Sequence, residues 1–99
     1  MLTTVSEWNF LTNYGHVVVY LSTNPDARIR DLADAIGITE RAAQRIVSDL
    51  VDAGYLTRTK TGRRNSYEIN PEAPLRHPLE RDHEVGELVR ALGGTGVTA

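Results

Sequence analysis

The chain has 99 residues, 40% of them hydrophobic, which suits one small domain and excludes an intrinsically disordered chain. It has no cysteine, which excludes disulfides, thiolate zinc sites and a thiol redox switch. No apolar run reaches the roughly 18 residues of a membrane span, and no basic region followed by an apolar stretch opens the chain. We therefore expect a cytoplasmic protein with no signal peptide and no membrane partner.

The net charge of −2 is unevenly distributed along the chain. Residues 28–64 carry eight basic and five acidic side chains, whereas residues 1–27 and 65–99 are both net negative. The stretch 58–64 holds four basic residues and no acidic one. Because the local field steers a polyanion to a protein surface, this pattern favours nucleic-acid binding despite the negative total.

The first element in chain order is an ambiguous N-terminal lead-in, residues 1–11. Thr12 or Asn13 is a candidate cap for a first helix that runs to about Ser22. The β-branched run at 17–19 leaves a strand as the alternative for this segment.

Aromatic residues are concentrated near this first helix, and they can cover a core or line a small cavity. Because large aromatic side chains are mostly buried, we expect Trp8, Phe10 and Tyr14 to belong to the core.

A helix-turn-helix is predicted next. The second helix runs from Arg28 to Ile36, because four apolar residues recur with helical spacing: Ile29, Leu32, Ala33 and Ile36. Gly37 suits the left-handed position after its end. Thr39 is a good N-cap for a third helix, which is expected from Glu40 to about Ala53.

The third helix has two faces of different character. Its buried stripe is expected to comprise Ala43, Ile46, Val47 and Leu50. The opposite face carries polar side chains of the types that bond base edges and phosphates: Arg41, Gln44, Arg45 and Ser48. Asp49 and Asp52 would repel phosphates, so the N-terminal half of the helix is expected to contact DNA. The alternative reading is an ordinary solvated face.

Two antiparallel strands, 55–59 and 65–69, follow the third helix and flank a turn at Gly62. Tyr67 and Ile69 should point to the core. The basic hairpin between the strands, a wing beside the third helix, is expected to contact phosphates or the minor groove, although a solubilising hairpin tip is the alternative. The complete predicted DNA-binding set is Thr39, Arg41, Gln44, Arg45, Ser48, Lys60, Arg63, Arg64 and Asn65.

Three stretches of this sequence carry a family resemblance: LADAIGIT at 32–39, IVSDLVDAGYL at 46–56 and GRRNSY at 62–67. With them, residues of about 12–70 resemble the winged helix-turn-helix domain of small prokaryotic transcriptional regulators of the MarR/ArsR type. The resemblance implies DNA binding, and it implies dimerisation through terminal helices.

A final helix is predicted within Leu75 to Leu92, after a break at 70–74, and the remaining residues, 93–99, resemble a flexible tail. Its interrupted apolar stripe is a candidate dimer interface, formed by Leu75, Leu79, Val85, Leu88, Val89 and Leu92. The alternative is that this helix folds back on the core of its own chain. On one side of it lie weak candidates for a metal site, Glu80, His83 and Glu87, for which a solvated acidic face is the favoured reading.

Together these patterns predict an α+β fold, mainly α. It consists of a winged helix-turn-helix domain at 12–70, with a three-helix core and a two-stranded wing, and a C-terminal dimerisation helix within 71–92. The predicted function is a sequence-specific double-stranded DNA-binding regulator, acting as a homodimeric repressor on a palindromic operator. The alternative is a winged-helix module that binds proteins. No enzymatic motif or cofactor site is recognised.

Overall fold

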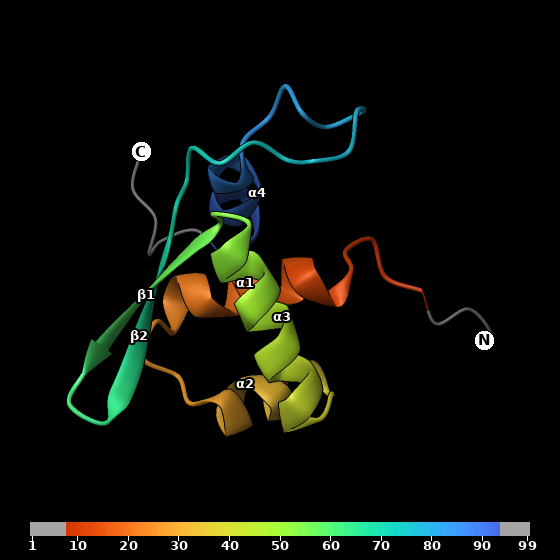
Figure 1. Cartoon of the computed structure of the whole chain (residues 1–99). Helices are drawn as coiled ribbons and strands as arrows, with labels where there is room; N and C mark the ends of the chain where they lie inside the picture. The colour runs from red at the N-terminus through yellow and green to blue at the C-terminus, as the bar shows by residue number, and fades with distance from the viewer. Residues whose placement is uncertain (1–7, 94–99) are drawn as a thin grey trace.

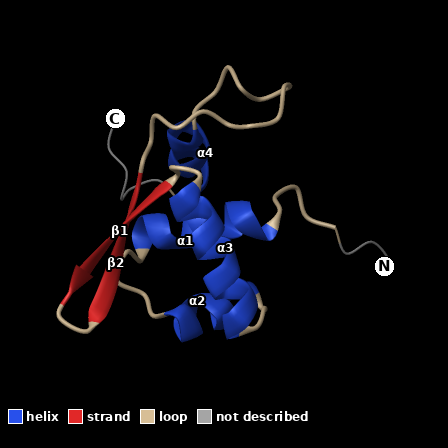
Figure 2. Cartoon of the chain, viewed as in Figure 1, coloured by secondary structure: helices blue, strands red, loops and turns tan. Residues whose placement is uncertain are grey.

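The computed structural model describes residues 8–93, in which three helices precede a two-stranded antiparallel hairpin and a C-terminal helix (Figures 1 and 2). This arrangement is an α+β winged helix, so the predicted fold class is confirmed. The elements are α1 (Asn13–Thr23), α2 (Ile29–Ile36), α3 (Glu40–Asp52), β1 (Leu56–Thr61), β2 (Arg64–Ile69) and α4 (Val85–Leu92).

The segment with the β-branched run is helical, so the strand alternative for it was wrong. In α1, Val17, Val18 and Leu21 are buried on one side of the helix. Burial of this face outweighs the weak preference of valine for strands, because propensity is easily overridden by tertiary packing. No helix within residues 8–93 is long and apolar enough to span a membrane.

One hydrophobic core joins all the elements. Its buried side chains come from every helix and from both strands, and the largest fully buried ones are Leu21, Leu32, Leu56, Val17, Val47 and Val89. The buried stripe expected on α3 is confirmed, since Ala43, Ile46, Val47 and Leu50 are all buried.

The turn between α2 and α3 depends on Gly37, whose φ of 87° lies in the left-handed region. The amides of Gly37 and Ile38 both donate to the Ala33 carbonyl, at 2.8 and 3.0 Å. A residue with a Cβ is strained at this φ, so glycine allows the chain to reverse immediately after α2. Thr39 then caps α3 as predicted, accepting a hydrogen bond of 3.0 Å from the Ala42 amide.

The hairpin pairs β1 with β2 from Leu56 opposite Ile69 to Thr61 opposite Arg64. Gly62, at φ 63°, lies in the short turn between the strands. Tyr67 is buried as predicted, whereas Ile69 is only half-buried. The hairpin is therefore held by its base in the core, and its tip extends away from it (Figure 1).

The C-terminal helix is shorter than predicted, because it begins at Val85 and not near Leu75. Residues 71–84 form a projecting loop that is closed by backbone pairing (Figure 2). The Leu75 amide donates to the His83 carbonyl at 3.0 Å, and Pro74 forms an isolated bridge with Glu84. Leu75 and Leu79 thus lie on this loop and not on a helical stripe.

Helix α4 folds back on its own chain. Val85 and Val89 are buried in the core, and the Gly86 amide donates to the Pro71 carbonyl at 2.9 Å. For these two valines, the alternative that the helix folds back on the core of its own chain is therefore correct, and the dimer-interface reading is not. Leu88 is half-buried and Leu92 is exposed, so the outer side of α4 remains accessible.

The expectation that the N-terminal aromatic residues belong to the core was wrong. Trp8 is 68% exposed and Phe10 is 93% exposed, and their rings make an edge-to-face contact with centroids 5.1 Å apart. Tyr14 is also exposed, on the first turn of α1. The core-facing side of α1 begins only at Val17, so these three aromatic side chains lie outside the core.

Candidate nucleic-acid interface

Helix α3 presents an uninterrupted polar face to solvent. Arg41, Gln44, Arg45 and Ser48 are all exposed, and they lie opposite the buried stripe of the same helix. The hydroxyl of Thr39 also belongs to the predicted DNA-binding set, but in this structure it accepts the Ala42 amide. Its observed contact is therefore that of a helix cap, which fixes where α3 begins.

The start of α3, helix α2 and the tip of the wing lie toward the same end of the molecule, at the bottom of Figure 1. The loop 71–84 and α4 lie toward the opposite end. Two of the three acidic residues of α3, Asp49 and Asp52, belong to the half of the helix that runs away from the wing tip, whereas Glu40 lies in its first turn. The basic and amide side chains of α3 are thus on the same end as the basic wing.

The basic side chains of the wing are accessible. Those of Arg58, Lys60, Arg63 and Arg64 are all exposed, as is the amide of Asn65. Within residues 8–93, the only ion pair joins His83 to Glu87. No carboxylate among the described residues therefore neutralises the wing arginines, whose charge remains available to an anion.

Arg64 makes a contact that the sequence does not reveal. One of its guanidinium nitrogens donates to the Asp26 carbonyl at 2.6 Å, although the two residues are 38 positions apart. Nearby, the Tyr67 amide donates to the Pro25 carbonyl at 2.9 Å. These two bonds tie β2 to the turn between α1 and α2, and so set the orientation of the wing relative to the helices.

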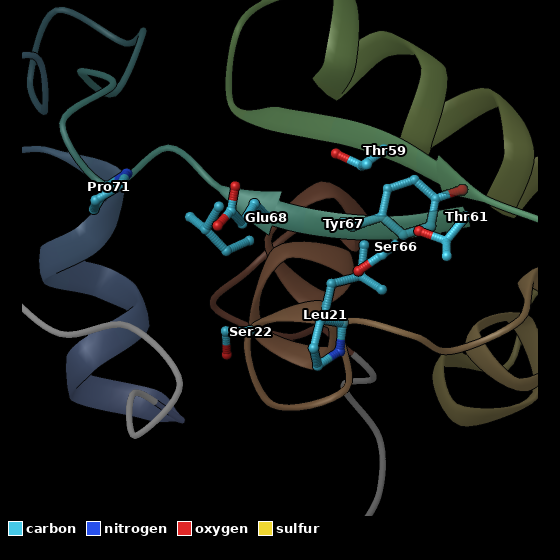
Figure 3. Close-up of a pocket in the computed structure, with 10 residues that line it drawn as sticks. Leu21, Ser22, Thr59, Thr61, Ser66, Tyr67, Glu68 and Pro71 are labelled. Atoms are coloured by element: carbon cyan, nitrogen blue, oxygen red, sulfur yellow. The ribbon is translucent and has the colours of Figure 1, made fainter. Parts of the chain in front are cut away.

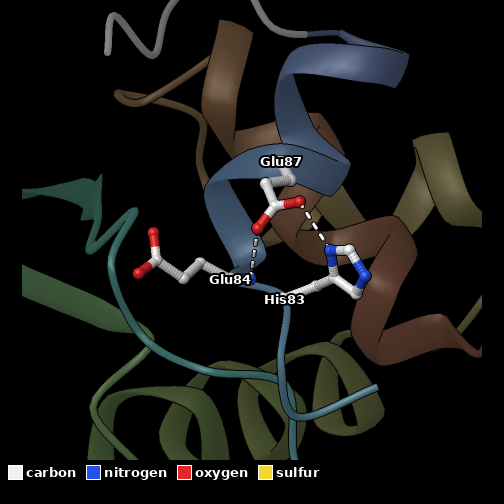
Figure 4. Close-up of polar contacts among 3 residues, drawn as sticks. All are labelled: His83, Glu84 and Glu87. Atoms are coloured by element: carbon white, nitrogen blue, oxygen red, sulfur yellow. Dashed lines mark hydrogen bonds and ion pairs between the residues drawn. The ribbon is translucent and has the colours of Figure 1, made fainter. Parts of the chain in front are cut away.

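The weak metal-site candidates do not share a helix face, because Glu80 lies on the loop before α4. His83 and Glu87 do meet, with 2.7 Å between Nδ1 and Oε1 (Figure 4). The other oxygen of Glu87 accepts the Glu84 amide at 2.9 Å and completes a capping box. No group of three or more potential ligands suited to a metal occurs in the described part of the chain.

These contacts shift two pKa values in opposite directions. The hydrogen bond to Glu87 is the main cause that raises the pKa of His83 above its usual 6.5. The Glu84 amide, followed by His83, lowers the pKa of Glu87 below its usual 4.5. His83, Glu84 and Glu87 therefore form a helix cap in which protonated His83 and ionised Glu87 are both stabilised.

A hollow of about 570 Å³ lies between the wing, the end of α1 and Pro71 (Figure 3). Hydroxyl groups from Ser22, Thr59, Thr61 and Ser66 line it together with the carboxylate of Glu68. It has no basic side chain in its wall, so its chemistry does not suit a phosphate, and we place it outside the nucleic-acid interface.

The helix-turn-helix, its exposed polar face and the adjoining basic hairpin define a winged helix-turn-helix protein. Residues 10–64 match the model of the MarR family, and this match covers more than half of the chain. The protein therefore belongs to the MarR family, whose members are DNA-binding transcription regulators and not enzymes. No curated protein matches the chain.

Proposed function

We propose that this protein is a homodimeric repressor that reads a palindromic operator. In this proposal the N-terminal half of α3 enters the major groove, which is wide enough for a helix, and the wing contacts the backbone or the minor groove. Within α3, Gln44 has the geometry to bond adenine, and Arg41 and Arg45 have the geometry to bond guanine. Ser48 would bond bases or phosphates.

One observation carries this proposal: the exposed polar face of α3 and the unneutralised basic wing lie toward the same end of the molecule. Lys60, Arg63, Arg64 and Asn65 would supply the wing contacts. Repression is the simplest mode of action, because a dimer that occupies a promoter blocks polymerase. It needs no further surface that contacts polymerase.

The proposed dimer interface comprises leucines of the loop 71–84 and of the outer side of α4. Leu79 is 88% exposed and Leu92 is 55% exposed, and half-buried Leu75 and Leu88 lie close to them in sequence. Val85 and Val89 are already buried in the chain's own core, so in this proposal they support the interface from beneath. A two-fold dimer formed in this way would match half-sites about one helical turn apart.

The DNA part of the proposal is tested by fluorescence anisotropy on duplex from the protein's own upstream region, against scrambled duplex, over a salt series. We expect tighter binding to the upstream duplex and an affinity that falls steeply with salt. Gln44→Ala should change the preferred bases, and Arg45→Ala should weaken binding. The charge-matched control is Arg81→Ala, on the loop at the far end, which should leave binding unchanged.

Binding by a protein-interaction module would look different. Such a module would show no preference for the upstream duplex, and Gln44→Ala would leave its sequence preference unaltered. Absence of binding even at low salt would overturn the proposed role of α3 and the wing.

The dimer is tested by sedimentation velocity on the wild-type chain and on Leu79→Glu with Leu92→Glu. Both leucines are exposed, so the double variant should fold normally and shift to monomer. Thr59→Glu with Thr61→Glu, at exposed positions on β1, is the control for two added charges. A wild-type chain that sediments as a monomer at high concentration would overturn the dimer.

A further inference from the structure

A second, smaller hollow of about 230 Å³ lies between the start of α2 and the β2 side of the wing near its tip. Its charged and amide lining residues are Arg28, Arg63, Arg64 and Asn65, and its remaining lining residues are Ala27, Ile29 and Tyr67. Three arginines, one at the N-cap of α2 and two at the tip of the wing, therefore line one opening. This concentration of positive charge is confined to a single recess, unlike the charge spread over the wing surface.

None of these guanidinium groups is paired with a carboxylate within residues 8–93. Asp26 and Asp31 are the nearest acidic residues to Arg28 in sequence, and neither carboxylate lies within 4 Å of a guanidinium nitrogen. Like charges gathered in one recess repel each other, and a bound anion would relieve that repulsion.

The recess is also partly fixed before any ligand binds. The Asp26 carbonyl holds Arg64 at 2.6 Å, so one wall is anchored to the turn before α2. The N-terminus of α2 forms another wall, with Arg28 at its cap position, and the helix dipole adds partial positive charge there. Because Arg64 is already held, this wall loses little conformational entropy when the recess binds an anion.

We propose that this recess seats one backbone phosphate of duplex DNA, with Arg28 as a phosphate-binding residue outside both α3 and the wing. Arginine suits this role because its planar fork bonds two phosphate oxygens at once. Arg63 and Asn65 complete the donor set, and Arg64 holds the wing against α2. The inference rests on the proposed function, because the phosphate belongs to the duplex that α3 reads.

The test compares Arg28→Ala with Arg30→Ala by anisotropy on the upstream duplex. Both arginines are exposed and lie two positions apart at the start of α2, but Arg30 does not line the recess. Arg28→Ala should weaken binding by about threefold to tenfold on every sequence and reduce the slope of log affinity against log salt by about one. Arg30→Ala should keep the wild-type slope, and urea unfolding should show that both variants are folded.

A methylphosphonate scan identifies the phosphate, because each substitution removes one backbone charge. In the wild-type complex, one substitution per half-site should weaken binding at least as much as Arg28→Ala. That substitution should have a smaller effect on the Arg28→Ala complex than on the wild type, since the two changes share the Arg28 contact. Equal slopes for the two arginine variants, or additive effects at every phosphate, would overturn the proposal.

Failure of the proposed function would be recognised separately, as absence of binding by the wild-type chain. In that case, titration with inorganic phosphate, followed by the NMR shifts of the Ile29 and Asn65 amides, tests the recess alone. Saturable shifts that Arg28→Ala abolishes would establish an anion seat that takes free phosphate and not duplex. Unchanged shifts would overturn the seat as well.

Discussion

Tyr14 donates a hydrogen bond of 2.6 Å to Oδ2 of Asp49, joining the first turn of α1 to the acidic half of α3. This contact raises the pKa of the Tyr14 phenol, mainly through the hydrogen bond itself, with burial and the charge of Asp49 as lesser causes. Both side chains are exposed, so the bond acts at the surface of the helix packing and not within the core. It holds α3 against α1 on the side away from the wing tip.

From this bond we predict that the Tyr14 phenol titrates at higher pH than a free tyrosine. The neutral phenol is favoured in the folded state, so its contribution to stability is present below pH 10 and is lost as the pH rises through the raised pKa. Ultraviolet titration of the wild type minus Tyr14→Phe isolates this phenol. Asp49→Asn should return its pKa toward the ordinary value, and an unchanged titration in that variant would contradict the assignment.

The cap of α3 gives a second prediction. Thr39→Ala removes the acceptor of the Ala42 amide and should lower the free energy of unfolding by about 1 kcal/mol in urea. Thr39→Ser keeps the hydroxyl and should restore most of the loss. If both variants are equally stable but only one binds DNA, Thr39 acts through a direct contact and not as a cap.

A third prediction concerns the close approach of α4 to Pro71. A Cβ added at Gly86 would lie 2.8 Å from both Cβ and the carbonyl oxygen of Pro71, which is too close for any real contact. Gly86→Ala should therefore push α4 away and cost about 1–3 kcal/mol of stability, despite the better helix propensity of alanine.

Exposed Ala91 provides the control for this measurement in the same helix. Ala91→Gly should cost up to about 1 kcal/mol through propensity alone. Urea unfolding of the two variants separates the effects, and a neutral or stabilising Gly86→Ala would contradict the steric argument.

The capping cluster of α4 predicts a pH window for stability. His83 has a raised pKa, so its contribution is full below pH 6.5 and is lost as the pH rises through the folded pKa. Glu87 has a lowered pKa, so its contribution is full above pH 4.5 and is lost as the pH falls through the folded pKa. Both contributions are therefore complete between pH 4.5 and 6.5.

The variant His83→Gln separates the alkaline loss of stability from the acid loss. It should remove the loss of stability on the alkaline side and leave the acid side, because the main cause of the Glu87 shift is the Glu84 amide. Thermal unfolding across pH 3 to 9 provides the measurement. An alkaline limb that persists in His83→Gln would assign it to another group.

The parts of the fold that the sequence predicts well are those with local causes. Gly37 must adopt a positive φ, Thr39 is a strong cap, and the apolar spacing of α2 and α3 selects the buried faces, so helix limits fall within a residue or so of expectation. The basic side chains predicted for the interface are exposed, as that role requires. Their contacts with DNA remain predictions.

The features that the sequence missed depend on contacts between distant segments. Nothing near Arg64 indicates that the Asp26 carbonyl will hold its guanidinium, or that Arg28 will share a recess with the wing. The predicted start of the C-terminal helix was too early, because Leu75 and Leu79 have the i, i+4 spacing of a helical stripe although they lie on a loop. Pro78 was the available signal, since proline disfavours helical geometry in the residue before it.

Helix α4 determines how short a fragment of this chain can still fold as a DNA-binding domain. Val85 and Val89 share one core with Val17 and Leu21, although the family match ends at residue 64. Cutting the chain after the wing would uncover the side of α1 on which these valines rest, and the fragment would tend to aggregate. A transplanted version should therefore keep every residue through α4, so the smallest autonomous module is longer than the segment that the family shares.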